Sequence, residues 1–166
     1  MTYASPPDIA LALPRPIAEY VPHAAGMCLL DTLVAADEHG LTARLAPRAD
    51  DLFAEAAGAP AHGIPGWVGI EWLAQAVAAW AGWQAAQRGE SPALGFLVGS
   101  RHYTSRRPHF SIGESFEVRI RCDCVAANGL GQFSGEILAV DTPGAAALAE
   151  GRLTIYQPPQ DATHDP

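Results

Sequence analysis

The chain of 166 residues contains no lysine, and its ten basic residues are all arginines. Aspartate and glutamate outnumber them 18 to 10, so the net charge is −8 with histidine neutral. A protein this acidic lacks the basic surface that nucleic-acid binding requires. We therefore expect no nucleic-acid partner. The missing lysine follows the chain's bias towards alanine and arginine and indicates no function.

Long hydrophobic runs and cysteines are also scarce. The most apolar segment is interrupted by Glu71 and Gln75, so no run of about 20 residues is fit to span a membrane. The first residues lack the basic and apolar regions of a signal peptide. Three cysteines, an odd number, fit neither a disulfide framework nor a zinc site. These absences favour a reduced, cytoplasmic protein that binds no metal.

The composition is that of one folded domain. Apolar residues make up 49% of the chain and charged residues 17%, which is typical of a globular protein. Residues 1–16, rich in proline and alanine, are expected to form a flexible arm. The polar residues 159–166 are expected to form a disordered tail. The folded domain is therefore predicted to span residues 17–158.

Strands are expected on both sides of one long helix. Pro65 and Gly66 open this helix, and Arg88 with Gly89 ends it. The strands predicted from apolar patterning are 27–36, 41–45, 94–107, 115–126, 132–140 and 146–157. This order favours an α+β fold in which an antiparallel sheet wraps around the helix. Because the helix is apolar nearly all round, we expect a partner subunit to cover what the sheet leaves open.

Two polar side chains in the helix are the most informative in the sequence. Glu71 and Gln75, one turn apart, are the only strongly polar residues in its first three turns. An unpaired charged carboxyl group in such a setting costs several kcal/mol. Perturbed carboxyl groups cluster at functional sites. Glu71 is therefore a candidate functional acid, and the alternative is a carboxyl group satisfied by the backbone of a partner subunit.

Three motifs follow one another along the chain: Val21-Pro-His23 with Met27-Cys-Leu-Leu-Asp31, Pro65-Gly66 with Glu71 and Gln75, and Arg107-Pro108 with Gly113-Glu114. In this order they resemble the hotdog-fold β-hydroxyacyl-(acyl carrier protein) dehydratases over about residues 20–157. The central helix, Leu94-Gly-Phe-Leu-Val-Gly-Ser100 and Tyr156-Gln157-Pro158 look more closely like the dehydratase-like subunits of aryl-polyene pigment biosynthesis. The resemblance implies a hotdog fold and a double-hotdog dimer, either a homodimer or a heterodimer with another hotdog subunit.

The resemblance also implies roles for residues at the start of the helix. Glu71 corresponds to the catalytic carboxylate of the family, and Gln75 to a positioning glutamine. Gly66 corresponds to the glycine whose N–H meets the thioester carbonyl. Trp67, in the apolar surroundings of Glu71, is expected to contact the acyl or aryl-polyenyl chain, although packing in the core is the simpler reading of the tryptophans.

The catalytic histidine of the family has no counterpart at its usual position. It lies fourteen residues before the carboxylate, where this chain has Ala57. One interpretation is a remodelled loop in which His62, or alternatively His23, serves as the base. The other interpretation is that the base is lost, with His62 in solvent and His23 fixing a turn.

Dehydration of a 3-hydroxyacyl thioester requires a base, an acid for the departing hydroxyl group and stabilisation of an enolate-like oxygen. Histidine is the usual base, helix N–H groups stabilise the oxygen, and burial favours a protonated carboxyl group. The predicted reaction therefore gives trans-2-enoyl thioesters, in polyene pigment or fatty-acid-type synthesis. The alternatives are a non-catalytic subunit that partners an active dehydratase and, third, an acyl thioesterase.

Three arginines are concentrated near one predicted strand of this acidic chain. Arg101, Arg106 and Arg107 are candidates to contact an acidic acyl carrier protein and the phosphate of its phosphopantetheine arm, which carries the substrate. A solvated strand end is the alternative. No cofactor of the chain's own is expected.

Overall fold

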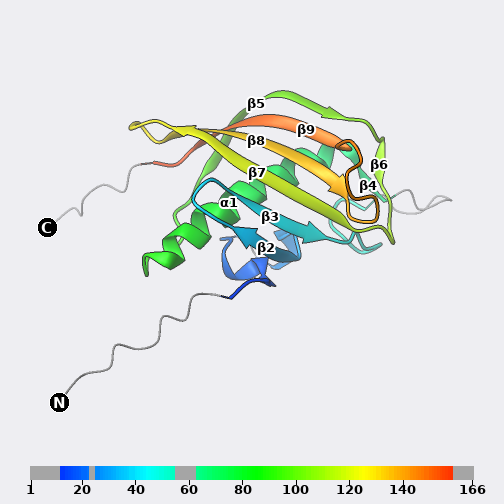
Figure 1. The fold of residues 1–166 in the computed structure, drawn as a ribbon, viewed down its shortest axis with the longest axis horizontal. Coiled ribbons are helices and arrows are strands. Elements are labelled where there is room, and N and C mark those ends of the chain that lie inside the picture. Colours follow the sequence, from blue (N-terminus) through cyan, green and yellow to red (C-terminus); the bar gives the residue numbers. More distant parts are fainter. Residues whose placement is uncertain (1–11, 23–24, 55–62, 159–166) are drawn as a thin grey trace, which may run out of the picture.

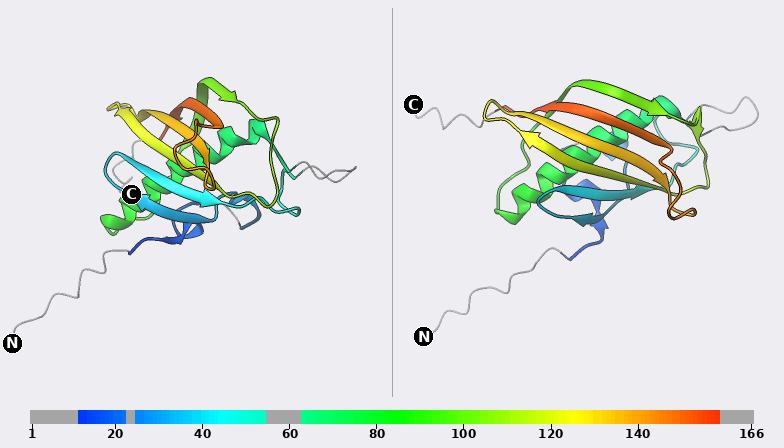
Figure 2. Two further views of the ribbon diagram at one scale, coloured as in Figure 1. Left: turned by 45° about the vertical axis from the view of Figure 1, so that its right-hand side comes forward. Right: turned by 45° about the horizontal axis from the view of Figure 1, so that its top comes forward.

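The computed structural model describes residues 12–22, 25–54 and 63–158, in which a curled antiparallel sheet surrounds one long helix, α1 (Gly69–Gln87) (Figure 1). The strands of the sheet are β1 (Arg15–Pro16), β2 (Thr32–Ala36), β3 (Gly40–Leu45), β5 (Phe96–Ser105), β7 (Phe116–Val125), β8 (Leu130–Ala139) and β9 (Ala149–Tyr156). Their order is β1-β2-β3-β7-β8-β9-β5. Two views in Figure 2 show the helix lying along the concave face of this sheet. This is the hotdog arrangement that the sequence predicts.

Short elements join the sheet to the helix. They are the 3-10 helices η1 (Ile17–Glu19), η2 (Ala25–Met27) and η3 (Gly66–Val68), and the two-stranded ladder of β4 (Ile64–Pro65) with β6 (His109–Phe110). Through this ladder, the chain that enters α1 is fixed to the segment that follows β5.

The core fills the space between α1 and the concave face of the sheet. Alternate residues of β7 point inward, so Phe116, Val118 and Ile120 are buried while the residues between them face outward. Trp72 of α1 packs on Phe110 with ring centroids 4.6 Å apart, and Phe110 packs on Phe116 at 5.2 Å. Contacts of this kind anchor the first turns of α1 to the sheet.

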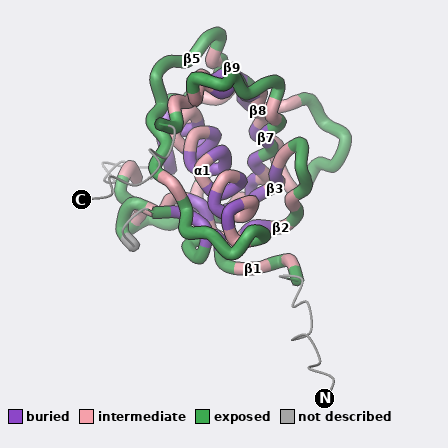
Figure 3. The backbone as a smooth tube through the Cα atoms, turned by 90° about the vertical axis from the view of Figure 1, so that its left-hand side faces the viewer, coloured by how far each residue is buried: buried purple, intermediate pink, exposed green. Residues whose placement is uncertain are grey.

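The two edges of the sheet differ in length and exposure. Strand β1 at one edge has two residues, whereas β5 at the other edge has ten. Most of β5 is exposed in Figure 3, where α1 lies inside the ring of strands. Large apolar side chains are among its exposed residues, including Phe96 at 54% and Val98 at 60%. This edge matches the expectation that a partner subunit covers part of the molecule.

Some predicted boundaries are wrong. The helix was expected to begin at Pro65, but Ile64–Pro65 pairs with β6 and the α-helix begins at Gly69, because the ladder extends the chain there. The strand expected over 27–36 begins at Thr32. Arg15–Pro16, expected in the flexible arm, pairs with β2. Residues 1–11 and 159–166 lie outside the described part. In that part, no helix is long and apolar enough to cross a membrane.

Candidate functional site

Gln75 ties the candidate acid to a distant loop. Its side chain is only 1% exposed. Its Oε1 accepts a hydrogen bond from the N–H of Leu29 at 2.9 Å, and its Nε2 donates to the carbonyl of Met27 at 2.7 Å and to Oε1 of Glu71 at 3.2 Å. Rotating the amide by 180° would set its NH₂ against the N–H of Leu29 and its oxygen against two acceptors. The network therefore fixes the orientation of Gln75.

The same network gives the two oxygens of Glu71 different roles. Oε1 accepts the hydrogen bond from Gln75. A protonated carboxyl group accepts best at its carbonyl oxygen, so the proton of the acid form belongs on Oε2. Glu71 is half-buried and lines a cavity. The side chain can thus present one donor oxygen to a molecule in that cavity.

The peptide of Gly66, at the start of η3, is hydrogen-bonded on both sides. Its N–H donates to the carbonyl of Pro108 at 2.7 Å, and its carbonyl accepts from the hydroxyl of Tyr103 at 2.6 Å. A Cβ at this position would clash with the carbonyl oxygen of Arg107, which explains the glycine. The N–H of Gly66 is therefore not free to meet a thioester carbonyl. The next N–H groups at the helix start, those of Trp67 and Val68, are the remaining donors.

Tyr103 is a site residue that sequence reasoning missed. Its ring lies beside Gly69, where a Cβ would clash with the Tyr103 hydroxyl. Burial raises the pKa of Tyr103 to about 12, although a hydrogen bond with Ser105 by itself lowers this pKa. The hydroxyl group therefore stays a neutral donor to Gly66 at physiological pH. Tyr103 lies in β5, 37 residues beyond Gly66 in the chain, and the sequence carries no local signal for this contact.

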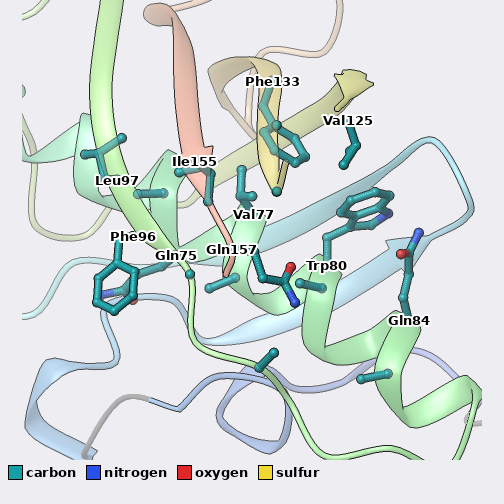
Figure 4. A pocket seen from close by; sticks show the side chains of 18 of the residues that line it. Gln75, Val77, Trp80, Gln84, Phe96, Leu97, Val125, Phe133, Ile155 and Gln157 are labelled. Carbon is teal, nitrogen blue, oxygen red and sulfur yellow. The ribbon is translucent and has the colours of Figure 1, made fainter. Parts of the chain in front are cut away.

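A cavity of about 560 Å³ lies beside α1 (Figure 4), and Glu71 is one of the residues that line it. Alanines at helical spacing form its floor: Ala74, Ala78, Ala81 and Ala85. Trp80 and Phe133 lie along one side in Figure 4, and Phe96 and Leu97 come from β5. Gln84 lies thirteen residues beyond Glu71, roughly 20 Å along a helix. The cavity can accommodate an extended apolar chain with Glu71 near one end.

The other predicted site residues are dispersed. Trp67 is 61% exposed, with its ring 5.6 Å from that of Phe53. Arg107 forms an ion pair with Glu114 at 2.7 Å, so its charge is already compensated. Although partial burial opposes it, this contact lowers the pKa of Glu114.

The predictions of a catalytic base concern His62 and His23. His62, His23 and Ala57 all lie outside the described residues. None of the described histidines lines the cavity that contains Glu71. Within the described ranges, no cluster of His, Cys, Asp and Glu side chains could hold a metal ion.

Comparison with known proteins identifies similar sequences and folds. The family model described as ApeP-like, ApeP dehydratase, matches residues 15–165. A chain of the dehydratase heterocomplex ApeI:P from Xenorhabdus doucetiae is 30% identical, with a TM-score of 0.75 over 88% of this chain and 93% of that one. Among curated proteins, no sequence matches significantly.

More distant structures share the fold alone. The E. coli PaaI protein from the phenylacetic acid degradation operon is 12% identical, with a TM-score of 0.53 over 75% of this chain and 81% of that one. AziG from S. sahachiroi is 15% identical, with a TM-score of 0.53 over 74% and 86% of the two chains. These similarities agree with the hotdog architecture.

Proposed function

Because this chain belongs to the ApeP-like dehydratase family, we propose that it is a dehydratase subunit that acts on 3-hydroxyacyl thioesters of an acyl carrier protein. The observation that carries the proposal is the environment of Glu71. Gln75 holds one carboxyl oxygen, and the other is available to the cavity. A positioned carboxylic acid of this kind can protonate a departing hydroxyl group.

The proposed reaction is an elimination of water. A base removes a proton from the carbon next to the thioester, and the electron pair of that C–H bond forms the new C=C bond. The C–O bond at the third carbon breaks, and Oε2 of Glu71 donates its proton so that water leaves. Negative charge that develops on the thioester oxygen is stabilised by N–H groups at the helix start, with Trp67 as the first donor. The product is a trans-2-enoyl thioester.

The substrate chain would occupy the cavity beside α1. The alanine floor lets a chain approach the helix closely, and the aromatic side chains offer flat apolar surface to an acyl or aryl-polyenyl chain. Pigment or fatty-acid-type synthesis would supply such a chain on phosphopantetheine. Arg101 and Arg106, both exposed, are available to an acidic carrier protein.

A second subunit would complete the site. None of the described histidines lines the cavity, which favours a base contributed from outside the described residues. The exposed β5 edge favours a second subunit beside the cavity. The related ApeI:P structure is a heterocomplex. The same observations support the second candidate function, a non-catalytic hotdog subunit that partners an active dehydratase.

The two candidates separate in one assay. The purified chain is incubated with a 3-hydroxyacyl carrier-protein thioester, alone and with an ApeI-type subunit, and the mass of the substrate is followed. Loss of water that requires Glu71 of this chain supports the catalytic role. Loss of water that is insensitive to Glu71→Gln supports the non-catalytic role, and loss of the whole acyl group would instead identify a thioesterase.

A further inference from the structure

Trp80 of α1 lies in the wall of the cavity, and its ring is held from two sides. Its indole Nε1 donates a hydrogen bond to the carbonyl of Asp37 at 2.8 Å. Its ring meets that of Phe133 edge to face, with an interplanar angle of 75° and centroids 5.6 Å apart. The polar edge of the indole is therefore satisfied by the protein itself, and the ring offers only apolar surface to the cavity.

The carbonyl of Asp37 is a fixed anchor for this ring. Asp37 opens the turn between β2 and β3, and its N–H donates to the carbonyl of Gly40 at 3.0 Å. Its Oδ1 accepts hydrogen bonds from the N–H of His39 at 2.8 Å and the N–H of Gly40 at 3.0 Å. Bonds of this kind hold a turn in one conformation. Because Trp80 is buried, rotating its ring out of the wall would leave the indole N–H without a partner.

A glycine keeps the second ring in the wall. A Cβ at Gly131 would lie 2.7 Å from the ring of Phe133, so any larger residue there would push the ring aside. Gly131 and Phe133 both line the cavity, and both belong to β8. The absence of a side chain at Gly131 therefore leaves room for the ring of Phe133 beside Trp80.

Two rings fixed in this way distinguish chains by their flatness. Aromatic rings pack on flat π-systems, stacked or edge to face, with a gain in affinity beyond the apolar area that is buried. A saturated chain of the same length gains the buried area only, and it loses more rotational freedom when it binds. The two rings thus make the cavity selective as well as apolar.

We infer that the ring pair of Trp80 and Phe133 determines the specificity of the cavity, favouring a chain with conjugated double bonds or an aromatic ring over a saturated chain. That this chain is the acyl part of a thioester rests on the proposed function, whereas the preference rests on the rings. Trp80 lies nine residues beyond Glu71, roughly 14 Å along a helix. The ring pair therefore acts on the affinity for the chain and not on the loss of water.

Two fatty acids of equal length provide the test. All-trans-parinaric acid has a run of conjugated double bonds, and stearic acid is fully saturated. The fluorescence of bound parinaric acid, and its displacement by stearic acid, give both dissociation constants for the full chain. We expect the wild type to prefer parinaric acid, and Trp80→Leu to lower this preference about two- to twelve-fold. Because the flexibility of stearic acid is the same in both measurements, the change in preference reports on the ring.

Two further variants control for folding and for the loss of a tryptophan. Trp83→Leu alters a tryptophan of the same helix that does not line the cavity, so it should keep the wild-type preference. Phe133→Leu removes the second ring and should lower the preference, which provides the test if Trp80→Leu does not fold. Equal affinity of the wild type for the two acids, or an unchanged preference in the folded ring variants, would overturn the inference. Binding is measured without turnover, so a failure here is distinct from failure of the proposed function.

Discussion

The start of α1 and the β5 edge differ in how completely their polar groups are satisfied. At the helix start, Gln75 uses both amide donors and its oxygen, and the peptide of Gly66 is bonded on both sides. At the β5 edge, Arg101 has no carboxylate partner among the described residues, and Val98 is 60% exposed.

This difference separates what the chain completes alone from what it leaves to a partner. A fully bonded polar network holds a site rigidly before any ligand arrives. An open strand with exposed apolar residues gains its stability only on association. The acid is therefore preorganised within one subunit, while the surface beside it is built for assembly.

The largest expected effect on stability is at Gln75. Gln75→Leu deprives the part-buried carbonyl of Met27 and N–H of Leu29 of their hydrogen-bond partner, at a cost of about 2–4 kcal/mol in the free energy of unfolding. Urea denaturation of the purified chain measures this loss. Gln87→Leu, on the exposed end of α1, is the matched control and should be nearly neutral. An equal change in the free energy of unfolding of the two variants would contradict the view that the helix start is a rigid network.

A smaller effect is expected at Tyr103. Tyr103→Phe removes one hydrogen bond to Gly66 and should lower the free energy of unfolding by about 1 kcal/mol. Because this bond orients the peptide ahead of Trp67, we expect kcat to fall with little change in KM. Tyr156→Phe is the control. If kcat is unchanged while stability falls, Tyr103 is a structural residue and does not position the helix start for catalysis.

The smallest expected effect on stability is at the β5 edge. Val98→Asp should change the free energy of unfolding by no more than about 0.5 kcal/mol, because the side chain is largely in solvent. Its association with an ApeI-type subunit, followed by sedimentation velocity, should weaken at least about tenfold, since the carboxylate would face an apolar partner surface. Leu52→Asp, also exposed, should affect neither quantity. Full association of Val98→Asp would place the interface elsewhere.

Local patterning predicted much of this architecture. The alternation of Phe116, Val118 and Ile120 was sufficient to place β7, and the spacing of Glu71 and Gln75 was sufficient to place both on one face of α1. The hotdog resemblance then gave the arrangement of sheet and helix. These features depend on residues that are neighbours in the sequence or on whole motifs.

Contacts between residues far apart in the sequence could not be predicted. The partners of Gln75 at Met27 and Leu29 lie more than 40 residues away in the chain, and no pattern links them. The carbonyl of Pro108, next to the ladder of β4 with β6, accepts the hydrogen bond of the Gly66 N–H, and a helix-start motif cannot reveal this contact. The bases proposed at His62 and His23 stay predictions, because both lie outside the described residues.

The role of Glu71 is tested most directly by the rate of water loss from a 3-hydroxyacyl carrier-protein thioester in the assembled complex. Glu71→Gln keeps an oxygen to accept from Gln75 but cannot donate a proton, so the rate should fall about 10²- to 10⁴-fold. Glu38→Gln, in an exposed turn, should keep the wild-type rate. A Glu71→Gln complex that assembles normally and dehydrates its substrate at the full rate would contradict the assignment of Glu71 as the acid.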